Sequence, residues 1–120
     1  MTKRILLGLH SQEIGDMCEL HATMQGYEVY RTDNPIDMVR MAREIPFERY
    51  IMDLNLGNPG SPDITSGREA WSIVGERVDG INVKFRGISG NDETVKAGEK
   101  AGIPSLENTV FASNIRQFFE

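Results

Sequence analysis

The sequence predicts an α/β fold, in which an open, doubly wound sheet of five parallel strands carries helices on both faces. Short apolar runs alternate with amphipathic stretches five times along the 120 residues, which is typical of a parallel sheet wrapped by helices. The apolar runs are nearly continuous, as in strands buried on both faces. Right-handed crossovers then distribute the helices over the two faces. We expect one domain over residues 1–120, since a chain of this length buries one core.

The first unit begins with the apolar run Ile5–Leu9, which predicts a buried strand. Ser11 is placed to cap a helix. The apolar face of this helix, at steps of three and four, is Ile14, Met17, Cys18, His21 and Met24. Gly26 is expected to end the helix, and a second strand is expected to start at Tyr27. Cys18 is the one cysteine in the chain, so no internal disulfide can form and we expect it to be a packing residue.

A second helix is predicted from Asn34–Pro35, a cap residue followed by proline at the first helical position. This helix is expected to bury Val39 and Ala42 and to end before Pro46. Tyr50–Leu54 is apolar almost throughout and predicts the third strand.

A loop rich in proline, glycine, asparagine and serine follows over Gly57–Ser66. Ser66 and Glu69 have the spacing of a capping box, which predicts that they open the third helix. Val83–Ile88 is expected to be the fourth strand.

The last third of the chain predicts two further helices and a short strand. Asn91 or Asp92 is expected to cap a helix that ends at Ala101–Gly102. Ile103–Leu106 is the predicted fifth strand. The inner stripe expected for one last helix is Phe111, Ile115 and Phe118.

Charge and composition exclude several classes of protein. The net charge is −5, from 13 basic and 18 acidic side chains, and the basic residues are scattered, which argues against a nucleic-acid surface. No apolar run is long enough for a signal peptide or a membrane span. We therefore expect a cytoplasmic protein without nucleic-acid or membrane partners.

Chemistry on a doubly wound sheet lies outside the carboxyl ends of its strands. Met52–Leu56, at the end of the third strand, resembles the motif of response-regulator receiver domains (CheY-like) in which an aspartate is phosphorylated; here that aspartate is Asp53. Three further segments are similar to motifs of the same family, in the same order: Gly26–Val29, Gly67–Glu69 and Ile88–Gly90. The resemblance covers the whole chain and implies the strand order 2-1-3-4-5. It also implies Asp53 as phospho-acceptor and, as contacts of the phosphoryl group, Ser89, Asn55 and Thr109.

The chain departs from this family at several site positions. Leu9 and His10 align with the two acidic residues that hold magnesium in the family. Thr109 aligns with its lysine, and Leu106 with its aromatic switch residue. Asp53 and Asn55, the latter through its backbone carbonyl, remain as metal ligands, so Mg²⁺ is expected to bind weakly and no other cofactor is expected.

His10 could be a base or a metal ligand beside Asp53, but we favour a polar residue that only ends a buried strand. Asp53 itself could be a strand-end carboxylate that only caps the following loop. Loss of the acids and of the lysine removes charge stabilisation from phosphoryl transfer. The resemblance therefore implies a receiver of a phosphorelay in which phosphorylation is weakened or lost.

We expect a protein that is not an enzyme and that binds protein partners, either a sensor kinase or a downstream effector. No output domain follows in the sequence, so a separate partner is expected to carry any output. The loop between the third strand and the third helix is longer than is usual in the family, and long loops at this edge often bind. Its candidate contact residues are Asn58, Ser61, Asp63 and Thr65, with Pro59 and Pro62 limiting its freedom.

Two alternatives remain open. Asp53-Leu54-Asn55 faintly resembles the Asp-x-Asp motif of a phosphatase of the haloacid-dehalogenase type. A flavodoxin-like sheet could instead bind a flavin or a nucleotide, although the chain has no glycine-rich phosphate loop.

Overall fold

The computed structural model describes residues 3–58 and 60–119. Five parallel strands form one sheet in the order β2-β1-β3-β4-β5, so the predicted fold class and strand order are confirmed. The strands are β1 Lys3–Gly8, β2 Tyr27–Thr32, β3 Arg49–Asp53, β4 Lys84–Ser89 and β5 Ser105–Glu107. The helices are α1 Gln12–Met24, α2 Pro35–Glu44, α3 Thr65–Val74, α4 Asp92–Lys100, α5 Asn108–Ser113 and α6 Ile115–Phe119, with a 3₁₀ turn at Gly75–Arg77.

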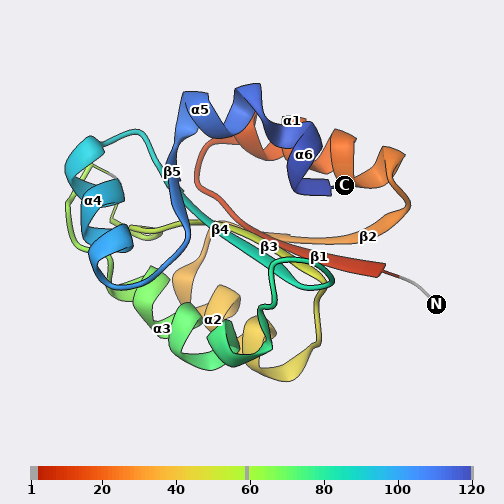
Figure 1. The fold of residues 1–120 in the computed structure, drawn as a ribbon, viewed down its shortest axis with the longest axis horizontal. Coiled ribbons are helices and arrows are strands. Elements are labelled where there is room, and N and C mark those ends of the chain that lie inside the picture. The colour runs from red at the N-terminus through yellow and green to blue at the C-terminus, as the bar shows by residue number, and fades with distance from the viewer. Residues whose placement is uncertain (1–2, 59, 120) are drawn as a thin grey trace.

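Helices cover both faces of the sheet. Figure 1 shows α1, α5 and α6 on one face and α2 and α3 on the other, with α4 beside β5. Within the described residues, no helix combines the length and the apolar character that crossing a membrane requires.

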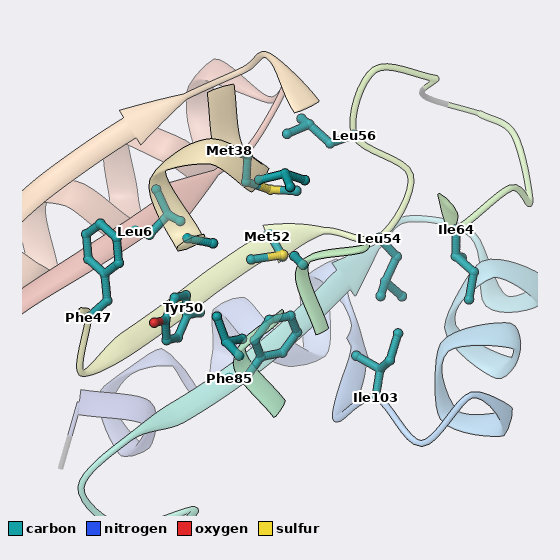
Figure 2. Packing of buried hydrophobic residues seen from close by; sticks show 14 residues of the cluster. Leu6, Met38, Phe47, Tyr50, Met52, Leu54, Leu56, Ile64, Phe85 and Ile103 are labelled. Atoms are coloured by element: carbon teal, nitrogen blue, oxygen red, sulfur yellow. The ribbon is translucent and has the colours of Figure 1, made fainter. Parts of the chain in front are cut away.

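The core consists of two apolar layers, because alternate residues of a strand point to opposite faces. Leu6, Tyr50 and Met52 pack under α2 and α3, in the layer shown in Figure 2. Ile51 lies between Tyr50 and Met52 in β3 and packs on the other face. That second layer also contains Cys18, Phe111, Ile115 and Phe118, as the sequence predicted.

Three helix caps form where the sequence predicted them. Ser11 Oγ accepts from the Ile14 amide at 3.2 Å. Asn34 Oδ1 accepts from the amides of Ile36 and Asp37, and Asn91 Oδ1 accepts from those of Glu93 and Thr94. Each cap lies shortly after a strand, so it fixes the turn by which the chain leaves the carboxyl edge of the sheet.

The predicted capping box at Ser66 and Glu69 is wrong. The helix α3 begins at Thr65, and no side chain caps it at Ile64. Ser66 Oγ instead donates to the carbonyl of Leu56 at 3.0 Å, which orients this hydroxyl toward the preceding loop. Tertiary contact with the loop therefore decides where Ser66 points.

Two other helix predictions need correction. Met24, expected on the inner face of α1, is the last residue of this helix and is 75% exposed. The expected last helix is two helices, separated at Asn114, whose amide donates to the Phe111 carbonyl. Its inner stripe is nevertheless buried as predicted.

Candidate functional site

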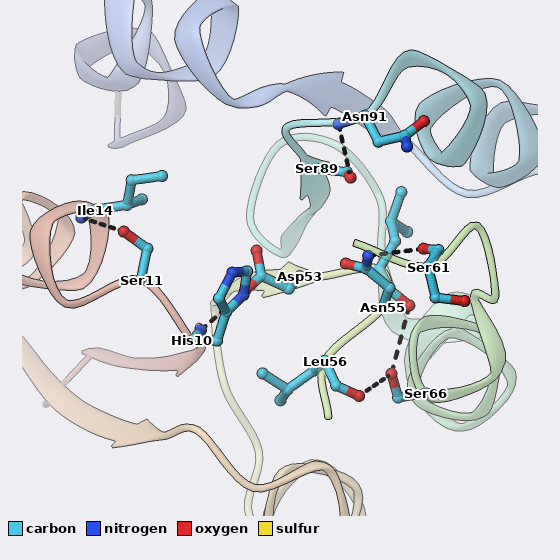
Figure 3. A network of polar contacts seen from close by, with 11 residues as sticks. His10, Ser11, Ile14, Asp53, Asn55, Leu56, Ser61, Ser66, Ser89 and Asn91 are labelled. Carbon is cyan, nitrogen blue, oxygen red and sulfur yellow. Dashed lines mark hydrogen bonds and ion pairs between the residues drawn. The ribbon is translucent and has the colours of Figure 1, made fainter. Parts of the chain in front are cut away.

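The site lies where β1, β3 and β4 end side by side. Gly8 pairs in register with Met52, and Asp53 pairs with Ile88. His10 follows β1, while Asp53 and Ser89 are the last residues of β3 and β4. Parallel pairing therefore brings together three residues that are far apart in the sequence, as Figure 3 shows.

Asp53 is buried and has His10 as its direct partner. Its side chain is 2% exposed, and Oδ2 accepts from the His10 backbone amide at 2.8 Å. The same oxygen forms a very close contact with Nδ1 of the His10 imidazole, which is 42% exposed. The interpretation of His10 as a residue that merely ends a strand is thus wrong, because parallel pairing of β1 with β3 places its ring on Asp53.

Burial raises the pKa of the Asp53 carboxyl above its usual value, because an ion loses hydration inside the protein. The hydrogen bond from the His10 backbone amide, the charge of His10 and its side-chain contact all oppose this rise in pKa. His10 therefore limits how far burial raises the pKa of Asp53.

Replacing His10 with alanine should raise the pKa of Asp53 further, because two of the three opposing interactions come from the imidazole. Carbon-13 NMR of the Asp53 carboxyl across an acid titration measures this pKa directly. His21→Ala, on α1, is the matched control and should leave the Asp53 titration unchanged. An unchanged pKa in His10→Ala would mean that the imidazole does not stabilise the carboxylate.

Two of the predicted phosphoryl contacts lie at this edge of the sheet. Ser89 is buried, and its Oγ accepts from the Asn91 amide at 3.1 Å. Asn55 is buried two residues beyond Asp53, and its side chain donates to the Ser61 carbonyl at 2.8 Å. The Asn55 carbonyl, the expected metal ligand, accepts from the Asn58 amide at 2.9 Å. Both polar groups of Asn55 thus hold the following loop.

Thr109 does not lie at a strand end, so its predicted position is wrong. The last residue of β5 is Glu107, which pairs in register with Ser89. Thr109 is exposed on α5, and its amide donates to Glu107 Oε2 at 3.0 Å. The hydroxyl and amide of Thr109 hold the pKa of Glu107 below its usual range. The strand end beside Ser89 therefore carries a carboxylate where the resemblance implied a neutral residue.

Two features of the sequence could have identified Glu107 as the residue that ends β5 and caps α5. Proline cannot donate a backbone hydrogen bond, so Pro104 favours a strand that starts after it. The ladder indeed begins at Ser105, and Pro104 contributes only its carbonyl, which accepts from the Gly87 amide at 2.8 Å. An acid just before a helix is also a common cap, and Glu107 caps α5.

The residues at the site do not fit a magnesium ion. Leu9, at the first position of the family's acidic pair, is 3% exposed and belongs to the apolar core. His10 occupies Oδ2 of Asp53, and the Asn55 carbonyl is used within the loop. No cluster of three or more histidine, cysteine, aspartate or glutamate side chains able to hold a metal occurs in residues 3–58 and 60–119. Magnesium prefers several oxygen ligands in octahedral geometry.

The loop between β3 and α3 is tied down at its centre. The Ser61 carbonyl accepts from Asn55 and, at 3.3 Å, from the Thr94 hydroxyl of α4. Asp63 Oδ1 accepts from the Thr65 amide at 3.0 Å. Asn58, Asp63 and Thr65 are exposed, and Ser61 is half-buried. The predicted partner contacts thus form a structured surface next to the site; Pro59 lies outside the described residues.

Neither protein-family models nor curated protein sequences match this sequence. Solved structures do. A CheY-like response regulator receiver domain protein from Methanospirillum hungatei has a TM-score of 0.66 at 17% identity, over 99% of this chain and 94% of its own. The receiver domain of a sensor histidine kinase from Pseudomonas aeruginosa, with magnesium coordinated in its active-site cleft, has the same score and identity, over 99% and 98% of the two chains. This chain has the receiver fold.

The receiver fold does not by itself carry a function. A de novo designed Rossmann 2x3 protein matches with a TM-score of 0.65 at 13% identity, over 100% of this chain and 94% of that one. What distinguishes this chain is therefore its site, and above all the contact between His10 and Asp53.

Proposed function

We propose that this chain is a signal-transduction receiver domain that acts by binding protein partners. Asp53 is its candidate phospho-acceptor, and phosphorylation is weakened or lost. The observation that supports this proposal best is the His10–Asp53 contact at the end of β3, on a receiver fold. The proposal includes no enzymatic activity.

Phosphorylation of Asp53 would require an Oδ atom to attack the phosphorus of a donor while the bond to the leaving group breaks. His10 already holds Oδ2 with its amide and its ring, so Oδ1 is the remaining nucleophile. Catalysis of phosphoryl transfer depends mainly on positive charge around the transferred oxygens. The neighbouring strand ends contribute Leu9 and Glu107, an apolar residue and an acid, which supports slow transfer.

Slow phosphorylation also bears on the kind of partner that this chain binds. A receiver with a slow acceptor signals through what it binds, either a sensor kinase or a downstream effector. The loop surface of Asn58, Ser61, Asp63 and Thr65 supports recognition near the site, since Ser61 anchors it to Asn55, just beyond β3, and to Thr94 of α4. An anchored loop loses little conformational entropy when a partner binds it.

Incubation with acetyl phosphate and magnesium, followed by intact-mass measurement, tests the acceptor. We expect slow and incomplete addition of one phosphoryl group, and none in Asp53→Asn. Asp63→Asn, on the exposed loop, is the matched control and should label like the parent chain. Leu9→Asp combined with His10→Asp should accelerate labelling at least tenfold, because it supplies the missing carboxylates for magnesium.

Rapid stoichiometric labelling of the unmodified chain would contradict the weakened site. Complete absence of labelling at high donor concentration, also in the double variant, would contradict Asp53 as an acceptor. Labelling that persists in Asp53→Asn would assign the acceptor to another residue.

A further inference from the structure

Residues 84–86 of β4 pair with β3 on one side but, within the described residues, with no strand on the other side. β5 pairs only with Gly87, Ile88 and Ser89. The Gly87 amide faces β5 and donates to the Pro104 carbonyl. The backbone groups of every second residue in a parallel strand point to the same neighbouring strand. The amide and carbonyl of Phe85 therefore point to the same side of β4 as those of Gly87, at a position that β5 does not reach. Pro104 has no amide hydrogen to donate to the backbone of β4, so the hydrogen-bond ladder between β4 and β5 stops there. Residues 84–86 therefore present an open strand edge.

A groove of about 420 Å³ lies along this open edge. The strand β4 forms one wall, and α5 and α6 form the other. Its apolar lining includes Leu106, Val110, Phe111 and Phe118, and its cationic lining is Lys84 and Arg86. Val110 is 46% exposed, so apolar surface at the groove is in contact with solvent. No residue of α4 lines the groove.

Within residues 3–58 and 60–119, the two cations of the groove have no acidic partner. Lys84 and Arg86 are two residues apart on one strand and so point to the same face. Arg86 is half-buried, and its Nε is buried without a hydrogen-bond partner in the part of the chain that the structure describes. Among the same residues, neither cation takes part in any ion pair. Burial also holds the pKa of Arg86 below its usual range. A carboxylate placed here would supply the missing acceptor.

We propose that this groove binds an extended, acidic segment of a partner protein, which adds a strand to the open edge of β4. Main-chain hydrogen bonds to Phe85 would set its register, and an acidic side chain would pair with Arg86 and Lys84. The open edge of three residues corresponds to about 10 Å of strand. Apolar residues two positions before and after the acid would point to the same face as the acid and fit the lining by Val110 and Phe118. The groove lies at the end of β4 opposite Ser89, so this inference is independent of phosphorylation at Asp53.

The probe is the peptide acetyl-Val-Thr-Glu-Thr-Val-amide, titrated into the nitrogen-15-labelled full chain and followed by amide NMR. We expect saturable shifts centred on Lys84, Phe85 and Arg86. The matched peptide with glutamine in place of glutamate should bind at least fivefold more weakly, because it lacks the charge. Arg86→Gln should cause a similar loss. Lys96→Gln, an exposed residue of α4, removes the same charge and should bind as the parent chain does.

Three results would overturn this inference. They are equal affinity for the two peptides, shifts that avoid residues 84–86, and sodium acetate producing the same shifts at the same concentration, which would indicate an isolated anion site. If Arg86→Gln does not fold, Lys84→Gln provides the same comparison and should weaken the acidic peptide about threefold. Unchanged affinity in that folded variant would also contradict the proposal.

Discussion

Replacing Arg49 with methionine is expected to lower the free energy of unfolding by about 3 kcal/mol. Arg49 begins β3 and is only 5% exposed. Its Nε donates to the Phe118 carbonyl at 2.9 Å, and Nη1 donates to the carbonyls of Glu48 and Asn82 at 2.9 and 2.8 Å. Methionine keeps an apolar stem of similar length but donates nothing. Three carbonyls around this side chain would lose a charged donor, and α6 would lose one of its hydrogen bonds to the sheet.

Urea denaturation followed by circular dichroism measures this loss. Arg43→Met is the matched control, since Arg43 is exposed on α2, and its change should stay within about 0.5 kcal/mol. A change in Arg49→Met as small as in the control would mean that the cost of burying the guanidinium cancels its hydrogen bonds. Arg49→Lys should lie between the two, because lysine keeps the charge but not the planar fork.

Replacing Asp53 with asparagine is expected to stabilise the fold at pH 7, by about 1 kcal/mol. Burial raises the pKa of this carboxyl in the folded chain. Between the unfolded and the folded pKa, the folded state therefore binds more protons, and the stability of the parent chain falls as the pH rises through this window. Asparagine carries no charge, so the stability of the variant does not fall in this pH window. Below the unfolded pKa both side chains are neutral, and the difference should vanish.

Urea denaturation of both chains between about pH 2 and about pH 7, at about half-unit steps, measures this difference. Asp79→Asn is the control of opposite sign. Asp79 accepts from the backbone amides of Ile81, Asn82 and Val83, and its pKa is lowered to about 2. Its carboxylate thus stabilises the fold above the unfolded pKa, so Asp79→Asn should be destabilised at pH 7 and recover at low pH. A less stable Asp53→Asn at pH 7 would show that the contact with His10 outweighs the burial of the charge.

The amino-acid sequence by itself determined those features that depend on neighbouring residues. A cap such as Asn34, followed by Pro35, starts a helix through its own side chain and the fixed φ of proline. The apolar run that includes Ile51 predicts a strand buried on both faces, wherever in the sheet it pairs. The predicted position of Asp53 at the end of β3 followed from this periodicity, and the resemblance to receivers gave the strand order.

Tertiary structure decided what depends on neighbours across the sheet. His10 contacts Asp53 because β1 and β3 pair in parallel, and no local pattern around residue 10 contains that register. Ser66 turns away from its expected cap because the carbonyl of Leu56 lies within reach. β5 ends at Glu107 because pairing with β4 can start only after Pro104, which leaves Lys84 and Arg86 on an open edge. Strand register and hydrogen-bond acceptors that are distant in the sequence are set only when the chain packs, so the position of these side chains depends on the folded structure.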